Sequence, residues 1–431
     1  MRKRVFIAFV STSQEFVRNN CDRIHTMELS RPIRLVSTEA GQSRRASWLE
    51  LFFDLIFVAA VAQVSVPLST NYTVHGLGRY ALMFLLIWWA WLGHTMYSSR
   101  FDSDDVLHRL LTFIQMFAAA AMAANAKAAF DSRDSAGFGA AYAVLRTVQS
   151  VQYLRARRLR ETRRLTTLYA VGTGVAAVAW AVAATMPVPA RFYMWAVALI
   201  VDLSTPWIAA RYTHRFPPHP EHLPERFGLF TIILLGESVA AVMRGMESQE
   251  TWPVSAAISA ISGLGLAFGY WWWYFDGVKG AAERRIQAGR GLRAFHLWTY
   301  IHFPLYLSIA VVGVGVEHVI SLPAGSHLHR EDAFILVLAG LLVAILLHVV
   351  GFTSEMSHNS RSRVSRFYQL VLLLAALPFA WFSAAVPGWV VLLYLFGTCG
   401  VGVILTSSHH LRRLPVDLST RLFELAKEGP L

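Results

Sequence analysis

Residues 49–68 read LELFFDLIFVAAVAQVSVPL, a stretch whose only charged side chains are two acids near its start. An α-helix rises about 1.5 Å per residue, so about 20 apolar residues cross the roughly 30 Å of hydrocarbon in a bilayer. This stretch therefore predicts a transmembrane helix. Similar apolar runs predict further spans at 76–97, 107–130, 135–154, 165–186, 191–211, 225–245, 254–276, 294–320, 331–352, 366–385 and 388–408.

The composition agrees with this interpretation. Of the 431 residues, 55% are hydrophobic and 15% are charged, whereas a soluble domain carries about 25% charged residues. We therefore expect an all-α, polytopic integral membrane protein with about twelve transmembrane helices. The net charge of +12 does not indicate a nucleic-acid partner, because Lys and Arg recur in short clusters between the apolar runs and form no single patch.

The distribution of Lys and Arg predicts the orientation of the helices. If the N-terminus is cytoplasmic, 32 of the 39 basic residues fall in tails and loops on that side, six fall near the other side, and Arg146 falls inside a span. Cytoplasmic loops are enriched in Lys and Arg. We therefore expect a multi-pass protein with both termini in the cytoplasm.

Both ends of the chain are predicted to be cytoplasmic tails. Residues 1–44 are rich in Lys and Arg and contain no long apolar run, so we expect poor order there, and residues 411–431 form the second tail. Cys21 and Cys399 are the only cysteines. They can build neither a disulfide framework nor a cysteine-based zinc site, and we expect no metal and no cofactor.

The spans at 49–68 and 225–245 resemble one another. Each opens with a glutamate, continues with aromatic and branched aliphatic residues, and becomes polar three to four turns later. The span that follows each of them carries a cluster of tryptophans. The matching elements are offset by six spans, an even number, so the halves would share one orientation, as in transporters built from parallel repeats. We expect two six-helix repeats, at 45–211 and 212–410.

Two acids, Glu50 and Asp54, stand four residues apart and share one face of the first span near its predicted cytoplasmic end. Carboxylates this close repel one another, so they could share a proton or a cation. The alternative is structural: Arg44, Arg45 or Arg226 pairs with them and fixes the end of the helix. The residue types alone favour neither interpretation.

Three charges are predicted at a similar depth inside the membrane, where a charge costs at least about 2.5–3.5 kcal/mol on insertion scales. Arg146 is the only arginine that lies far from both ends of a predicted span, and Asp202 lies in the middle of the sixth span. Glu237 follows Glu225 by three turns, which places it about 18 Å along its helix. We expect Arg146 to pair with Asp202 or Glu237. One arginine cannot neutralise both acids, so the second acid suggests a proton or cation site.

Other polar residues are weaker candidates for a functional site. His302 lies inside a span, where a histidine is more often hydrogen-bonded structure than a ligand, although it could relay protons. Asp102, Asp104 and Asp105 form a D-x-D-D motif, which some isoprenoid cyclases use to protonate an alkene. Such an acid needs a dry pocket, and this loop should be wet. The chain contains no Walker, G-x-G-x-x-G, G-x-S-x-G or HExxH motif.

Two motifs in combination carry a family resemblance. The first span opens with Trp48-x-Glu50-Leu-Phe-Phe-Asp54-Leu-x-Phe-Val, and the seventh with Glu225-Arg226-Phe-Gly228-Leu-Phe-x-Ile-Ile-x-Leu-Gly236-Glu237-Ser238. Both motifs are similar to those of the bacterial low temperature requirement A family. The resemblance covers roughly residues 44–410. The resemblance implies a multi-helix protein of the bacterial cytoplasmic membrane. The family is named for a growth phenotype, so it implies no substrate.

Three functions stay open at this point. The leading hypothesis is a transporter or channel for a cation, a proton or a small solute, in which Glu50, Asp54 and Glu237 line one polar cavity that opens towards the cytoplasm. The second is a membrane-embedded enzyme that acts on a lipid or isoprenoid, with Glu237 or an acid of the D-x-D-D motif as the proton donor. The third is a non-catalytic sensor or adaptor linked to growth in the cold. The bilayer is the one partner that the sequence predicts.

Reporter fusions test the predicted topology. Fusions at Ser103, Glu161, Pro218 and Gly289 should all report the cytoplasm, because each position lies in a loop on the side that carries most Lys and Arg. The measurement is the paired activity of an alkaline phosphatase and a fluorescent protein fused at each position. A periplasmic signal at two of the four positions would overturn the predicted number of spans.

Overall fold

The structure is a computed structural model of the whole chain. It describes residues 32–36, 46–131, 134–213, 215–219, 221–278, 291–323, 326–354 and 386–411, together with the single positions 374, 378 and 381. Nearly all of the described residues are helical.

Eleven of the predicted spans coincide with helices. The first half contains α2 (Trp48–Thr70), α3 (Val74–Ser98), α4 (Val106–Ala124), the short α5 (Ala126–Phe130), α6 (Ala136–Ala156), α7 (Arg163–Thr185) and α8 (Ala190–Thr213). The second half contains α9 (His222–Glu247), α10 (Val254–Val278), α11 (Gly291–Ser321), α12 (Arg330–Ser354) and α15 (Gly388–Leu411). The predicted span 366–385 lies outside the described residues except for three positions.

Within the described residues, 9 helices are long and apolar enough to cross a membrane. They are α2, α3, α4, α7, α8, α9, α10, α11 and α12. The helix α6 is as long as its neighbours but more polar, and the apolar part of α15, Gly388–Ile404, is shorter. The prediction of an all-α, polytopic membrane protein is therefore confirmed, whereas the number of twelve spans stays a prediction.

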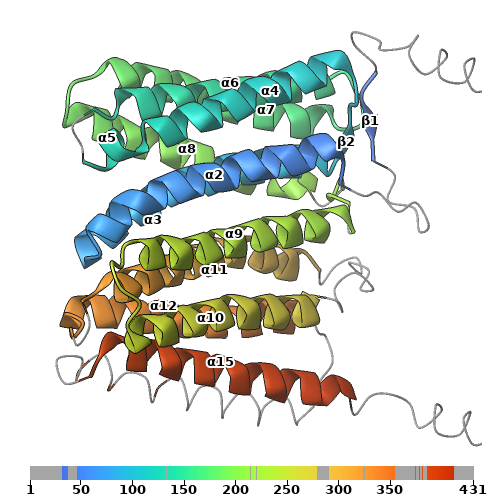
Figure 1. Ribbon diagram of the computed structural model, residues 1–431. Coiled ribbons are helices and arrows are strands. Elements are labelled where there is room, and N and C mark those ends of the chain that lie inside the picture. Colours follow the sequence, from blue (N-terminus) through green and yellow to red (C-terminus); the bar gives the residue numbers. More distant parts are fainter. Residues whose placement is uncertain are drawn as a thin grey trace, which may run out of the picture.

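The helices lie side by side in two groups (Figure 1). In the first group, α4, α6, α7 and α8 pack in series, and α2 packs on α3 and α4. In the second group, α9 to α12 and α15 pack on one another. The groups meet where α2 and α3 contact α9 and α11. We call the end of the bundle at which α2 begins the near end, which corresponds to the predicted cytoplasmic side, and the opposite end the far end.

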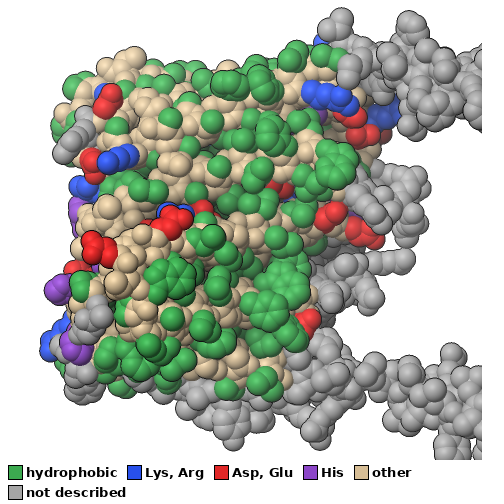
Figure 2. Space-filling model, viewed as in Figure 1, with side chains coloured by type: hydrophobic (Ala, Val, Ile, Leu, Met, Phe, Trp, Pro, Cys, Tyr) green, Lys and Arg blue, Asp and Glu red, His purple; other side chains and the backbone are tan. Residues whose placement is uncertain are grey.

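Large apolar side chains cover the outside of the bundle. Tyr193 (72%), Trp207 (71%), Trp252 (74%) and Val178 (65%) are mostly exposed. Figure 2 shows hydrophobic side chains spread over the visible face, with most charged side chains towards the two ends. An apolar surface of this extent needs lipid around it, because a soluble monomer rarely exposes large apolar patches.

A short antiparallel sheet lies at the near end. In it, β1 (Arg34–Leu35) pairs with β2 (Phe101–Asp102). Ile33, just before β1, is buried in an apolar cluster with residues of the bundle. Residues 32–36 therefore pack on the bundle, and the rest of segment 1–44 lies outside the described residues, so the poor order expected there stays a prediction.

The helix α6 turns its polar side chains inward. Arg146, Gln149 and Gln152 are all buried, and α6 packs between α4 and α7. Polar groups at this position need partners inside the protein, because lipid offers none. The polar face of α6 therefore brings a charge and two amides into the bundle.

Candidate functional site

The two sequence motifs meet at the near end of the bundle. Ser47 caps α2: its hydroxyl accepts a hydrogen bond from the amide of Glu50 (3.3 Å), and its own amide donates to the Glu50 carboxylate (2.8 Å). The amide of Ala46 donates to the carboxylate of Glu225 on α9 (3.2 Å). The start of α2 is thus fixed to the start of α9.

Arg226 lies between the two acids of α2. Its guanidinium donates two hydrogen bonds to Asp54 (3.0 and 2.6 Å), and a third nitrogen lies 3.1 Å from Glu50. The indole N–H of Trp91 also donates to Asp54 (2.7 Å). Arg226 and Asp54 are completely buried, so each charge depends on the other. This geometry agrees with the structural interpretation of the two acids.

A histidine extends this arrangement to the loop after α3. Nε2 of His222 lies 3.3 Å from Glu50, and its Nδ1 lies 3.1 Å from the hydroxyl of Ser99. We call Glu50, Asp54, His222 and Arg226 the near-end cluster. Among the described residues, no group of three or more His, Cys, Asp and Glu side chains is arranged to hold a metal ion. The near-end cluster joins α2, α3 and α9.

Glu237 does not belong to the near-end cluster. Arg244, two turns further along α9, donates to Glu237 (2.9 Å) and to Glu317 of α11 (2.9 Å). Residues seven apart lie on one face of a helix, so Arg244, in the last turn of α9, reaches back to Glu237. Glu237 therefore pairs with a different arginine from Glu50 and Asp54, which does not support the hypothesis that the three acids line one cavity.

Arg146 pairs with Asp202, as predicted. The Arg146 Nε lies 2.7 Å from the Asp202 Oδ2, and the hydroxyl of Tyr142 donates to the same carboxylate (2.9 Å). The other guanidinium nitrogens donate to Gln149 and Tyr142. Arg146 lies ten residues before the end of α6, which is about 15 Å along the helix. The pair is therefore buried near the middle of the bundle.

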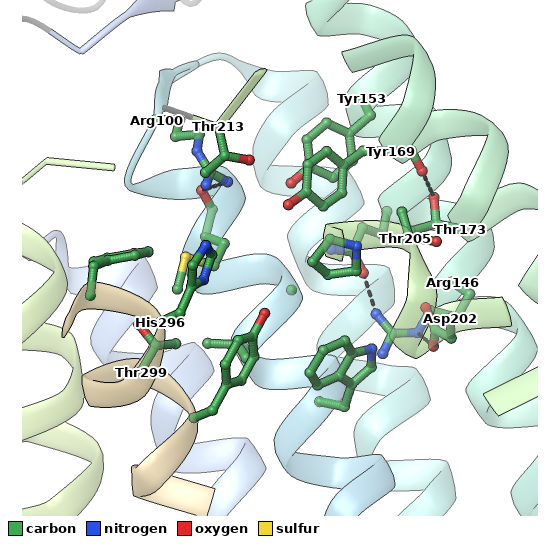
Figure 3. Close-up of a pocket in the computed structure, with 18 residues that line it drawn as sticks. Arg100, Arg146, Tyr153, Tyr169, Thr173, Asp202, Thr205, Thr213, His296 and Thr299 are labelled. Atoms are coloured by element: carbon green, nitrogen blue, oxygen red, sulfur yellow. Dashed lines mark hydrogen bonds and ion pairs between the residues drawn. The ribbon is translucent and has the colours of Figure 1, made fainter. Parts of the chain in front are cut away.

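This ion pair lines a pocket between the two helix groups (Figure 3). The cavity itself has a volume of about 50 Å³. Most of its lining comes from α3, α6, α7 and α8. The helix α11 supplies Phe295, His296, Thr299 and Tyr300. Arg100 and Thr213 lie at the near-end side of the pocket, and the ion pair lies deeper. Small-molecule sites typically measure roughly 300–1,000 Å³, so in this conformation the cavity is smaller than such a site.

Aromatic rings and hydroxyl groups form much of the lining. The rings of Tyr153 and Tyr169 stack with their centroids 4.8 Å apart, and the guanidinium of Arg100 lies 5.9 Å from the ring centroid of Tyr169. Thr299 is 1% exposed, and its hydroxyl has no hydrogen-bond partner within the described part of the chain. The pocket therefore offers stacking surfaces and polar groups to a small solute.

A row of rings connects the helix groups along the pocket. The indole of Trp207 on α8 stacks on His296 and on Tyr300, with centroids 6.4 Å apart in both cases. Tyr300 stacks in turn on Trp89 of α3 (6.1 Å). Because Trp207 is largely exposed, this row extends from the pocket to the outer surface of the bundle.

His302 lies in the second group, away from the pocket lining. Its Nε2 lies 3.1 Å from the hydroxyl of Tyr274, and its Nδ1 lies 2.6 Å from the carbonyl oxygen of Trp298. The ring of Phe227 packs edge-on against it (4.7 Å). Both ring nitrogens therefore have partners, as in a hydrogen-bonded core histidine.

The acids of the D-x-D-D motif have structural partners. Asp104, which is largely exposed, pairs with Arg109 (3.0 Å). Asp105 caps the start of α4 and pairs with Arg155 (2.6 Å). Asp102 is exposed on β2. An acid that protonates an alkene needs a dry pocket, so this geometry does not support the enzyme hypothesis.

Most residues that line the pocket have no distinguishing signal in the sequence. Arg100 contributes to the charge asymmetry of the loops, and Trp89 belongs to a tryptophan cluster, but neither pattern indicates a ligand. Thr299 lies in a helix rich in aromatic and hydroxyl residues, where spacing does not set it apart. Arg146 and Asp202 could be found because a charge inside a span is costly.

These features define an all-helical, polytopic membrane protein with a charged pair in a pocket between its helix groups. The chain belongs to the bacterial low temperature requirement A (LtrA) family, whose model matches residues 45–404. It is 28% identical over 296 residues to the uncharacterized protein RA0937 of Rhizobium meliloti (strain 1021), a match that covers 66% of this chain and 72% of that protein. No solved structure matches the chain.

Removal of Arg226 should destabilise the protein. The Arg226→Leu variant leaves two buried carboxylates without their cation, which should cost about 3–5 kcal/mol. The measurement is the melting temperature and yield of the purified protein in detergent. As a control, Arg109→Leu removes the partner of the exposed Asp104 and should cost at most about 1 kcal/mol. Equal melting temperatures for the two variants would show that the near-end cluster is dispensable.

The Arg146–Asp202 pair should show strong coupling in a double-mutant cycle. Arg146→Asp and Asp202→Arg each place two like charges together inside the bundle, and each should lower the melting temperature strongly. The double variant restores opposite charges at the same depth and should recover part of the loss. A double variant no more stable than either single variant would contradict the importance of this ion pair.

Proposed function

We propose that the protein is a carrier that binds a small solute in the pocket between α3, α6, α7, α8 and α11 and moves it across the membrane. The observation that carries this proposal is the Arg146–Asp202 ion pair, which is buried near the middle of the bundle and lines the pocket. Ionisable side chains inside a membrane are costly, and they commonly mark a solute path. Here the costly pair borders a cavity between the two helix groups.

The pocket walls come from both helix groups, and this supports a carrier rather than a static binding protein. One wall comes from helices of the first group, and the facing wall comes from α11 of the second group. A rotation of one group against the other would widen one end of the pocket and narrow the other. Transporters built from two helical halves change their access by this kind of motion. Stacked rings, including Tyr300 and Trp89, would slide past one another during it.

The packing of the helices supports the proposed repeat as well. In the first group, α2 packs on α3 and α4, and α3 and α4 both pack on α6. In the second group, α9 packs on α10 and α11, and α10 and α11 both pack on α12. The two patterns match when α2, α3, α4 and α6 are superimposed in order on α9, α10, α11 and α12. We propose that residues 45–211 and 212–410 are parallel repeats.

This carrier differs from the sequence hypothesis in its key residues. Glu50, Asp54 and Glu237 have arginine partners outside the pocket, so their proposed role is structural. The solute path instead uses Arg146 and Asp202. With the near end in the cytoplasm of a bacterium, the pocket would begin at that face and reach the middle of the membrane.

Cysteine accessibility tests this proposal without knowledge of the solute. In a background with Cys21 and Cys399 replaced by serine, Thr205→Cys places a thiol in the pocket wall, where Thr205 is now buried. A carrier opens its site to each face in turn. A membrane-impermeant sulfonate reagent should therefore modify this thiol both in intact cells and in inside-out vesicles, as measured by the loss of the gel shift that a polyethylene glycol maleimide gives with thiols left unmodified.

Two exposed positions provide matched controls for sidedness. Thr70 ends α2 at the far end, and Glu161 lies in the loop between α6 and α7 at the near end. Thr70→Cys and Glu161→Cys should each react in one preparation and not in the other. If Thr205→Cys reacts only in the preparation that modifies Glu161→Cys, the carrier proposal fails and a one-sided binding site remains.

A further inference from the structure

The pocket has an excess of positive charge. Its lining contains two arginines, Arg100 and Arg146, and one carboxylate, that of Asp202. Arg146 lies 2.7 Å from Asp202, so these two charges neutralise one another. The uncompensated charge therefore belongs to Arg100.

Arg100 is 3% exposed and lies in the loop that follows α3. Its Nε donates to the carbonyl oxygen of Phe216 (3.2 Å), and its Nη1 donates to that of Met96 (3.3 Å). Both acceptors are neutral. Within the part of the chain that the structure describes, no carboxylate oxygen lies within 4.0 Å of its guanidinium. A buried cation without a counter-charge is costly, and the arginine fork matches the oxygens of an anionic group.

The surroundings of Arg100 suit the body of an organic molecule. Figure 3 shows Arg100 at the near-end side of the pocket, with Tyr153 and Tyr169 on one wall and His296 and Thr299 of α11 on the facing wall. The tyrosine rings offer flat apolar faces. The buried hydroxyl of Thr299, which has no partner among the described residues, offers a hydrogen bond.

We infer that the pocket takes a small organic anion, whose anionic group binds Arg100 and whose body lies against the tyrosine rings. The inference rests on the proposed function of the pocket, but it concerns the charge of the solute and not its movement. A cation is disfavoured, because it would meet the excess positive charge of the lining.

The test compares anionic and cationic thiol reagents on purified, full-length Thr299→Cys protein in detergent, with Cys21 and Cys399 replaced by serine. The rates with the sulfonatoethyl and the trimethylammonioethyl methanethiosulfonates are each divided by the rate with free 2-mercaptoethanol. The anion-to-cation ratio of these normalised rates should be at least about tenfold higher for Thr299→Cys than for the exposed Thr70→Cys. In the Thr299→Cys protein, Arg100→Gln should abolish this preference, whereas Arg100→Lys, which keeps the charge, should preserve it.

A second arm measures binding directly. Benzoate and benzamide have the same shape and differ in charge. Millimolar benzoate should slow the modification of Thr299→Cys, and benzamide at the same concentration should slow it less. Arg100→Gln should make the two compounds equivalent.

Equal reagent ratios at Thr299→Cys and Thr70→Cys would overturn the inference, as would equal protection by benzoate and benzamide. These outcomes are separate from those of the carrier test, because detergent-solubilised protein has no two membrane faces. If Thr299→Cys shows the anion preference but Thr205→Cys is accessible from one face only, the protein binds organic anions without carrying them. If Thr205→Cys is accessible from both faces but Thr299→Cys shows no anion preference, the protein is a carrier for another class of solute.

Discussion

The pairing of Arg226 with Asp54 is the interaction on which the arrangement of the two helix groups depends. It joins α9 to α2, the first helices of the two groups, at a place where neither charge can be exposed to water. Trp91 attaches α3 to the same carboxylate. Because α3 also contributes Trp89 and Gly93 to the pocket, the near-end cluster positions one wall of the proposed solute site.

The helices could be predicted from the sequence because the thickness of a bilayer fixes their length. The run 107–130 is an instructive exception, since α4 ends at Ala124 and α5 begins at Ala126. Between them, the side-chain amide of Asn125 donates to a backbone carbonyl oxygen of α4, and asparagine competes with regular helix in this way. The count of residues predicts depth but not rotation about the helix axis. The similar depth of Arg146 and Asp202 therefore predicted their pairing. The rotation that turns Glu237 towards Arg244 could not be predicted in this way.

The two clusters of polar residues differ in how far the sequence reveals them. Glu50, Asp54 and Arg226 belong to motifs, and their pairing was one of the alternatives that residue types allow. The contributions of Trp91 and His222 depend on how α3 and α9 pack, which no spacing encodes. The pocket is harder still to predict from the sequence, because tyrosine, threonine and tryptophan are common in membrane helices. Their convergence from five helices is a property of the tertiary structure alone.

The inward polar face of α6 has a consequence for how the protein is made. Its Arg146, Gln149 and Gln152 make α6 a poor candidate to enter lipid by itself. The ribosome completes α6 before it reaches Asp202, so the arginine emerges without its partner. The insertion machinery would therefore have to shelter α6 until α7 and α8 follow, and release the three helices into the bilayer together. Loss of Asp202 would then impair biogenesis of the protein before any solute is encountered.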